Sequence, residues 1–268
     1  MDVPRISASS YSNTAPLIWS FLYGKYHGRA EVILDTAPAR SAELLAAGRV
    51  DAALVPVIAS QFMENIRLVP GVAVGARDRV RSVCLITTRD AIEEVRSVAL
   101  DTSSRTSAAL VKIIFREFIG SEPLWTEAKP DAAAMLADND AALLIGDPAL
   151  AISETGQISD GRSVNVFDLA ALWRKYTGLG FIFAMWMSRA GKIGLDFAAA
   201  RDEGLEHIEE IIANYIPDIP ITRDEMRIYL TQNIVFRPDD EMLLGMELYL
   251  KLAAKHNLIP SPPVIKML

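Results

Sequence analysis

The order of predicted elements along the chain constrains its fold most strongly. The order strand, helix, strand, helix, strand occurs twice in the first 145 residues. The first run ends in the apolar segment Asp51–Val55, and the second ends in the similar segment Asp140–Ile145, which starts 89 positions later. Strands that alternate with helices pair in parallel through right-handed crossovers. We therefore predict an α/β protein with two similar lobes, each built on its own sheet.

The individual elements follow from apolar periodicity and from helix start and stop signals. In the first run, Pro16 suits the first turn of a helix that opens at Asn13, and Ser41 is placed to cap the next helix. We predict strands at Arg5–Ser9, Glu31–Thr36, Asp51–Val55, Ser97–Leu100, Leu124–Glu127 and Asp140–Ile145, and helices from Asn13, at Ala42–Ala47, Ala108–Phe118 and Asp131–Ala137.

Two apolar strands outside these runs, Ser82–Thr87 and Phe181–Met187, are expected to carry the chain from one lobe to the other and back. We assign residues 1–84 and 185–268 to lobe one and residues 85–184 to lobe two. The remaining chain is helical and is expected to pack on lobe one. The predicted helices are Ile193–Asn214, one that starts at Thr222 with Glu225 completing a capping box, and one from Asp239 to Lys255.

Charge and hydropathy limit the partners of the chain. Its 268 residues carry a net charge of −7, so there is no overall field that attracts nucleic acid or an anionic membrane. The start of the chain lacks the basic and apolar regions of a signal peptide. The longest apolar stretches, Ala52–Ala59 and Leu179–Met187, are far below the roughly 20 residues of a membrane span. We therefore expect a cytoplasmic protein without nucleic-acid or membrane partners.

Polar residues gather where the predicted strands end. Ligands of such sheets bind beyond the carboxyl ends of the strands, in this case in a cleft between the lobes. Helix N-termini offer unpaired N–H groups and a positive dipole end, which favour anions. The sequence therefore predicts a small ligand with one or two carboxylates. The polar strand ends are Ser10–Asn13, Pro56–Val57, Asp101–Ser107 and Gly146–Asp147.

Several of these residues have a purely structural alternative. Ser103 and Ser104 precede a helix and suit a helix cap as well as a ligand contact. Asn13 likewise suits either a helix cap or a ligand contact. Asp147 is followed by Pro at the first helical position, so it suits a cap as well as a catalytic role. Arg105 stands where the helix dipole disfavours a cation, which is easier to understand if an anion also binds.

Common catalytic and metal-binding patterns are missing from the sequence. No set of His and carboxylate residues has metal-ligand spacing, and the one Cys cannot form an internal disulfide. There is no Gly-rich phosphate loop and no Gly-x-Ser-x-Gly elbow. Taken alone, the residues predict a two-lobed protein that binds a small organic anion, with an enzyme and a receptor both left open.

Five motifs resemble those of the chorismate dehydratases of the futalosine pathway to menaquinone, and the similarity extends over roughly residues 4–260. Asn13 of the first motif is retained, although Ser12 stands where the family tends to have Leu. The motifs are Ser10–Leu17, Asp51–Pro56, Arg81–Val83, Asp101–Ser107 and Ala142–Leu150.

The resemblance implies a fold like type II periplasmic binding proteins, with two mixed or parallel sheets flanked by helices and a ligand cleft between the lobes. It also implies that chorismate loses water to give 3-[(1-carboxyvinyl)oxy]benzoate without a cofactor or a metal. Loss of the ring hydroxyl makes the ring aromatic, so the protein mainly has to orient the substrate and help proton and hydroxide leave.

The resemblance leads to a hypothesis for each site residue. Asn13, Ser82 and Asp147 are expected to be catalytic. Asn13 and Ser82 hold the enolpyruvyl group, and Asp147 contacts the departing hydroxyl or positions water. The base is either Asp147 or the side-chain carboxylate of the substrate itself. The expected substrate-binding residues, several of which hold a carboxylate, are Tyr11, Pro56, Val57, Thr102, Ser103, Ser104, Arg105, Thr106 and Gly146.

Two other functions compete with this prediction. One is the related pathway step that makes 1,4-dihydroxy-6-naphthoate, but its usual motifs include a His, which none of the three His residues of this chain supplies near the cleft. The other is a solute-binding protein for transport, which the lack of a signal segment argues against.

Overall fold

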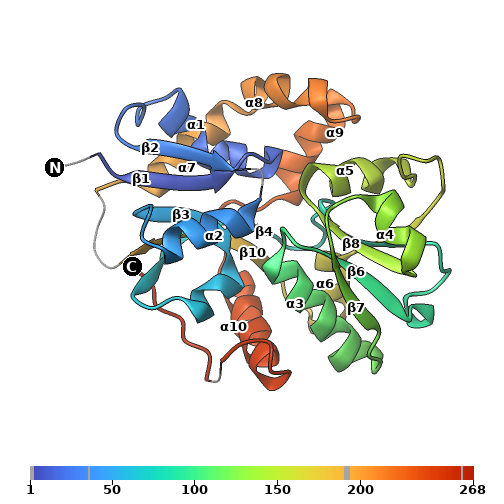
Figure 1. The fold of residues 1–268 in the computed structure, drawn as a ribbon. Helices are drawn as coiled ribbons and strands as arrows, with labels where there is room; N and C mark the ends of the chain where they lie inside the picture. Colours follow the sequence, from blue (N-terminus) through green and yellow to red (C-terminus); the bar gives the residue numbers. More distant parts are fainter. Residues whose placement is uncertain (1–2, 36, 190–193, 261) are drawn as a thin grey trace.

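Two five-stranded sheets lie side by side in the computed structural model, which describes residues 3–35, 37–189, 194–260 and 262–268 (Figure 1). We call each sheet with the helices that flank it a lobe. The strand order is β2-β1-β3-β10-β4 in the first lobe and β7-β6-β8-β5-β9 in the second. The predicted α/β class with two sheets and flanking helices is confirmed.

The first lobe contains the two ends of the described chain and the strand that follows its return from the second lobe. Its strands are β1 (Arg5–Ser9), β2 (Glu31–Asp35), β3 (Ala52–Pro56), β4 (Ile66–Ala76) and β10 (Phe181–Arg189). The helices near its strands are α1 (Ala15–Leu22), α2 (Pro38–Ala46), α7 (Phe197–Glu206) and α8 (Ile208–Tyr215), with short turns at Ser12–Thr14 and Val57–Phe62.

The second lobe repeats the arrangement of the first. Its strands are β5 (Val83–Thr87), β6 (Ser97–Asp101), β7 (Leu124–Ala128), β8 (Ala141–Ile145) and β9 (Asn165–Asp168). Its helices are α3 (Arg105–Ile113), which continues as a wider turn to Ile119, α4 (Ala132–Asp138), α5 (Gly146–Thr155) and α6 (Leu169–Thr177).

The parallel pairing predicted from the repeated order holds for three strands in each sheet. β1 pairs in parallel with β2 and β3, and β6 pairs in parallel with β7 and β8. The other two strands of each sheet are antiparallel to their neighbours, because β10 and β5 each enter a sheet from the opposite lobe. The common edge at the ends of the parallel strands therefore faces the other lobe.

The passages between the sheets lie a few residues from the predicted borders. Borders at 84/85 and 184/185 fall inside β5 and β10, and each of these strands pairs along its length within a single sheet. The chain crosses between sheets at 77–82 and at 178–180 instead. Ser82–Thr87 and Phe181–Met187 are therefore sheet strands, and the crossings are the short segments before them.

Some local predictions were wrong. α2 begins at Pro38, so Ser41 lies inside the helix, where its hydroxyl is buried and hydrogen-bonded to Ser7 at 2.9 Å. The helix predicted at Ile193–Asn214 is two helices that meet at His207, which stacks on Trp19. Two predicted ends, Thr36 and Ile193, lie outside the described residues. The sequence reading did not include β4, β9 and α6.

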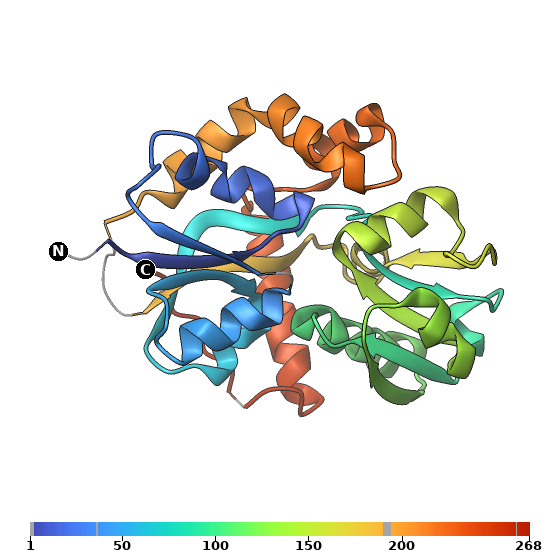
Figure 2. The same ribbon diagram turned by 45° about the horizontal axis from the view of Figure 1, so that its top comes forward.

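The C-terminal helices join the two lobes. α9 (Arg223–Ile228) carries the predicted capping box of Thr222 and Glu225, and α10 (Asp240–Lys255) begins and ends as predicted. α10 lies below the first sheet (Figures 1 and 2) and packs against β10 as well as against α3 of the second lobe. Tyr249 of α10 donates a hydrogen bond to the Thr106 carbonyl at 3.0 Å. This helical layer thus fixes the lobes relative to each other.

Candidate active site between the lobes

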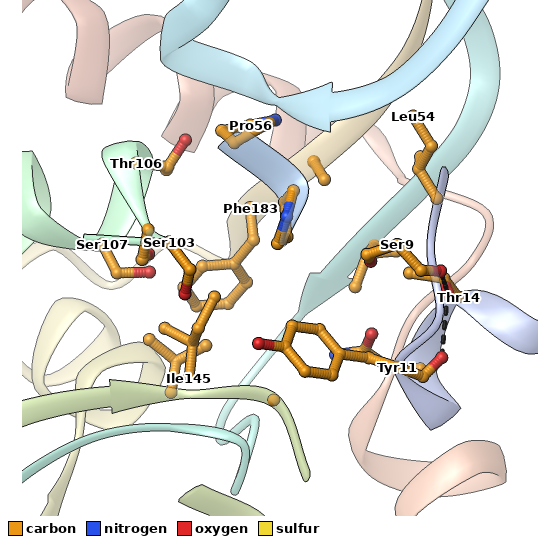
Figure 3. A pocket seen from close by; sticks show the side chains of 17 residues that line it. Ser9, Tyr11, Thr14, Leu54, Pro56, Ser103, Thr106, Ser107, Ile145 and Phe183 are labelled. Carbon is orange, nitrogen blue, oxygen red and sulfur yellow. Dashed lines mark hydrogen bonds between the residues drawn. The ribbon is translucent and has the colours of Figure 1, made fainter. Parts of the chain in front are cut away.

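A narrow cavity of about 60 Å³ lies between the two lobes, where the parallel strands end. Side chains of the second lobe form one side of it and side chains of the first lobe form the other (Figure 3). Both polar turns predicted from the sequence open on this cavity. The lining residues are Ser9, Tyr11, Asn13, Thr14, Pro38, Leu54, Pro56, Val74, Val83, Ser103, Ser104, Thr106, Ser107, Ile145, Gly146, Phe183 and Ala184.

The second lobe contributes the N-terminus of α3. Ser104 is the residue before the helix, yet its side chain makes no capping hydrogen bond, so the first N–H groups of α3 are not satisfied by it. Ser103 is held by Asp101, whose Oδ1 accepts hydrogen bonds from the Ser103 N–H at 2.8 Å and its hydroxyl at 2.6 Å. Asp101 therefore braces this turn, and hydroxyls and helix N–H groups face the cavity together.

The first lobe contributes the turn before α1. Thr14 at the start of α1 makes no side-chain cap, because its hydroxyl donates back to the Tyr11 carbonyl at 2.8 Å (Figure 3). Asn13 is 9% exposed and lines the cavity. The cavity is thus flanked by the starts of two helices, one from each lobe. The Thr14 and Ala15 N–H groups of the first are bonded to the Tyr11 and Ser12 carbonyls, so only its dipole favours an anion, whereas the start of α3 has no side-chain cap on its N–H groups.

The walls between these two turns are apolar. Phe183 of β10 stands at the back of the cavity, with Ile145 of β8 and Leu54 of β3 on either side (Figure 3). Val74, Val83 and Pro56 complete this region. The arrangement suits a flat apolar ring that carries an anionic group at each end, because the polar donors sit at the ends and the middle excludes water.

The lobes touch each other beside the cavity. Asp147 of the second lobe accepts hydrogen bonds from the Ser12 N–H, 3.2 Å from Oδ2, and from the Ser12 hydroxyl. Gly146 has a φ of 69°, and a Cβ there would lie 2.8 Å from the Tyr11 ring of the first lobe. The Thr106 hydroxyl also accepts a bond from the Ile58 N–H at 3.4 Å. These contacts join the two lobes beside the cavity.

Burial changes the acidity of the ionisable groups around the cleft. Desolvation raises the pKa of Asp147, and its hydrogen bonds from Ser12 offset part of that rise. Burial likewise raises the pKa of Asp101, against the opposing effect of Ser103. The Tyr11 pKa is also raised, mainly by burial. No cationic side chain lines the cavity among the described residues, so donors on neutral groups would hold an anion there.

Seven of the twelve predicted site residues line the cavity. They are Tyr11, Asn13, Pro56, Ser103, Ser104, Thr106 and Gly146.

The other five lie close by. Arg105 points outward, and its guanidinium lies 3.6 Å from Glu43 of α2 across the cleft. Thr102 is exposed, and Val57 is fully buried beside Pro56. Ser82 is fully buried one residue before Val83, which lines the cavity, and Asp147 is bound to Ser12. The cap alternative for Asp147 was wrong, since α5 already begins at Gly146.

The sequence reading missed Ser107 and Phe183. Ser107 belongs to the motif Asp101–Ser107. Its position one helical turn after Ser103 and Ser104 could have predicted that it faces the same cavity. Phe183 belongs to an apolar strand and resembles an ordinary core residue, so nothing local could have separated it from its neighbours.

No group of three or more His, Cys, Asp or Glu side chains is placed to hold a metal ion in the part of the chain that the structure describes. No helix within those residues is both long enough and apolar enough to cross a lipid bilayer.

The two lobes and the cleft between them define a fold of the periplasmic-binding-protein type. Comparison with protein families then gives a match to the menaquinone biosynthesis family over residues 4–255. The chain belongs to this family. A chorismate dehydratase from Thermus thermophilus is 31% identical over 217 residues, which cover 75% of this chain and 77% of that protein. The family resemblance seen in the sequence motifs is confirmed.

Solved structures show the same fold at low sequence identity. A protein from Archaeoglobus fulgidus matches with a TM-score of 0.69 at 14% identity, covering 96% of this chain and 98% of the other. The periplasmic aliphatic sulphonate-binding protein of Escherichia coli matches with a TM-score of 0.66 at 16% identity, covering 97% and 89%. The predicted binding-protein-like fold is confirmed.

Proposed function

We propose that this protein is a chorismate dehydratase, a hydro-lyase that converts chorismate to 3-[(1-carboxyvinyl)oxy]benzoate in menaquinone biosynthesis. Membership of the menaquinone biosynthesis family and the relative from Thermus thermophilus support an enzyme of this pathway. The observation that carries the proposal is that two polar turns open on one apolar cavity, the turn with Asn13 before α1 in one lobe and the turn with Ser104 before α3 in the other.

Chorismate has the charges that the lining of this cavity favours. Its cyclohexadiene ring carries one carboxylate directly and a second on an enolpyruvyl ether two ring positions away. In the proposed pose, the α3 turn with Ser103, Thr106 and Ser107 holds one carboxylate by hydroxyl and N–H donors. Asn13, with Ser82 behind it, holds the enolpyruvyl end. Phe183 and Ile145 lie against the ring.

The reaction removes one proton and one hydroxide from adjacent ring carbons. The C–H bond on the carbon that bears the ether breaks, its electrons form the new ring double bond, and the C–O bond to the hydroxyl breaks. The base that takes the proton passes it to the departing hydroxide, so that water is released and the base is regenerated, and no oxidant is needed. Orientation by the two carboxylate sites would supply much of the rate, because it holds the base and the two breaking bonds in a reactive geometry.

We propose that the base is the enolpyruvyl carboxylate of the substrate. Asp147, the other candidate, is absent from the cavity lining, and both of its oxygens accept hydrogen bonds from Ser12. In the proposed pose Asn13 and Ser82 hold one oxygen of that carboxylate, and the other faces the apolar walls without a donor, where it is poorly solvated and accordingly more basic. Asp147 is left with a different role, that of joining the lobes.

The decisive experiment mixes the purified protein with chorismate and follows the ultraviolet spectrum. We expect an aromatic product at catalytic protein concentrations without added metal or cofactor. Asn13→Ala and Ser107→Ala should each lower kcat/KM by about ten- to a hundredfold, since each removes a hydrogen bond to a charged group worth about 1.5–3 kcal/mol. Leu244→Ala on the exposed face of α10 is the matched control.

Other outcomes would identify the competing functions. Chorismate that binds and stays unchanged at catalytic protein levels would contradict the proposal and favour a solute receptor. No binding of chorismate, together with turnover of a larger pathway intermediate, would favour the naphthoate synthase step.

A further inference from the structure

A buried tyrosine hydroxyl behind the cavity has no role in the site described so far. Tyr229 begins the wide helical turn Tyr229–Asn233 that follows α9, and its side chain is fully buried. The chain just after this turn is fixed to the first lobe, because Val235 and Gly75 of β4 exchange backbone hydrogen bonds. Tyr229 is therefore held at a defined position relative to the first sheet.

Arg81 ties the same turn to the crossing between the lobes. Its Nη1 donates to the Glu225 carbonyl and to Asn233 Oδ1, both at 3.3 Å, so it contacts the chain on either side of Tyr229. Its Nε donates to Glu154 of α5 at 2.8 Å. Arg81 has a φ of 62° and directly precedes Ser82. The position of Ser82 is thus fixed against the segment that carries Tyr229.

The Tyr229 hydroxyl has Ser82 and Asn13 as polar neighbours. Burial raises the pKa of Tyr229 far above its usual value and the charge of Asp147 adds to the rise, while hydrogen bonding by Ser82 and Asn13 opposes it. The phenol keeps its proton at neutral pH, so it acts as a hydrogen-bonding group and not as a base.

Two hydroxyls of this cluster lack hydrogen-bond partners among the described residues. Tyr229 Oη and Ser82 Oγ are both fully buried, and neither has a hydrogen bond of good geometry to any described residue. Buried hydroxyls without partners are rare in folded proteins and call for an explanation. An aligned chain of hydrogen bonds from Tyr229 through Ser82 and Asn13 to an anion would satisfy them.

We propose that Tyr229 is a positioning residue that aligns the Ser82 hydroxyl and the Asn13 amide toward the enolpyruvyl end of the substrate. The inference rests on the proposed function, because it states how the Ser82 hydroxyl and the Asn13 amide are oriented toward the substrate of the dehydratase. A carboxylate draws the O–H and N–H donors of Ser82 and Asn13 toward itself. The phenol, with one donor and two acceptor sites, can then pair with the atoms that face away.

The test replaces Tyr229 by Phe, which removes the hydroxyl and keeps the ring. We expect kcat to fall about ten- to a hundredfold, with a smaller change in KM, since Asn13 and Ser82 remain present but lose their alignment. The thermal midpoint should stay the same or rise, because the variant removes an unsatisfied buried polar group. Tyr176→Phe on α6, whose ring stacks on Phe118, is the matched control and should change neither quantity.

A double variant separates positioning from packing. If Tyr229 acts through Ser82, adding Tyr229→Phe to Ser82→Ala should cost much less than Tyr229→Phe alone, because the partner is already missing. Three results would each overturn the inference. They are losses that add in the double variant, a Tyr229→Phe variant as active as the native protein, and a loss of activity in proportion to a lower thermal midpoint. Native protein that neither converts nor binds chorismate would instead overturn the proposed function, and the inference with it.

Discussion

The Asp147 carboxylate of the second lobe binds Ser12 of the first, accepting hydrogen bonds from both its backbone N–H and its hydroxyl. The two residues are 135 positions apart in the chain, and their contact lies next to the cavity. Asp147 thus satisfies N–H and O–H donors at the turn before α1, as a capping residue would, but from the opposite lobe. The contact connects closure of the cleft to the turn that carries Asn13.

The first prediction concerns the catalytic base. Asp147→Asn should retain kcat to within about tenfold, because the amide oxygen still accepts from Ser12 while the substrate carboxylate removes the proton. A general base contributes about 10²–10⁴-fold, so a loss in that range would identify Asp147 as the base. Product formation under saturating chorismate measures the difference. Ser12→Ala serves as the control that weakens the same contact without touching the carboxylate.

The second prediction concerns the close approach of Gly146 and Tyr11. Gly146→Ala should destabilise the protein by about 1–2 kcal/mol through its left-handed backbone and should also raise KM, because the new Cβ collides with the Tyr11 ring. Gly156→Ala is the matched control, since Gly156 has a φ of 63° and no atom within 4 Å of the position of a Cβ. Denaturant unfolding and KM are both measured. Equal KM changes in the two variants would show that the ring contact has no part in closure.

Much of the fold was predictable because the pattern was local. The buried strand Ala52–Pro56 and its counterpart Ala141–Ile145 are short apolar runs between helices, which identify central parallel strands. β4 was missed because Pro70 and Gly71 interrupt its alternation, and Gly71 has a φ of 74° inside the strand. β4 still forms, since it pairs with β10 from the far end of the chain.

The candidate site was partly predictable for the same reason. The serine-rich turn before α3 carries its own signal, because hydroxyls at a helix N-terminus suit an anion. The pairing of Asp147 with Ser12 and of Arg105 with Glu43 had no such signal in the sequence. Asp147 before Pro148 looks like a local cap, and only the folded chain brings Ser12 to it. Arg105 looked like an anion contact until α2 of the other lobe brought Glu43 beside it.

The third prediction follows from that position of Arg105. Its side chain is 45% exposed and pairs with Glu43 at 3.6 Å, and exposed pairs of this kind contribute about 0–1 kcal/mol. Arg105→Ala should therefore change KM for chorismate by less than about fivefold, and Glu43→Gln should have a similar effect. A rise in KM of more than tenfold for Arg105→Ala alone would mean that the guanidinium turns inward to bind the substrate.

The fourth prediction concerns the pH dependence of stability. Burial raises the pKa of Asp101 above its ordinary value of 3.8, so between that value and the folded-state pKa the folded chain holds a proton that the unfolded chain has lost. The contribution of Asp101 to stability is therefore fully present below about pH 4 and is lost as the pH rises through the folded-state pKa. An Asn at this position cannot titrate and loses nothing.

We therefore expect the free energy of unfolding of Asp101→Asn, relative to the native protein, to increase as the pH rises from 4 to 7. Asp140→Asn is the control with the opposite sign. Hydrogen bonding to Arg89 lowers the pKa of Asp140, so its contribution is nearly complete above the ordinary value of 3.8 and is lost as the pH falls through the lower folded-state pKa. The variant should therefore be less stable than the native protein by a nearly constant amount above about pH 5, and the difference should shrink at lower pH. Urea unfolding of all three proteins at several pH values measures both slopes. If the difference in unfolding free energy between Asp101→Asn and the native protein does not change with pH, the Ser103 hydrogen bonds fully cancel the effect of burial on the Asp101 pKa. Asp101 would then hold the turn before α3 at no cost to stability.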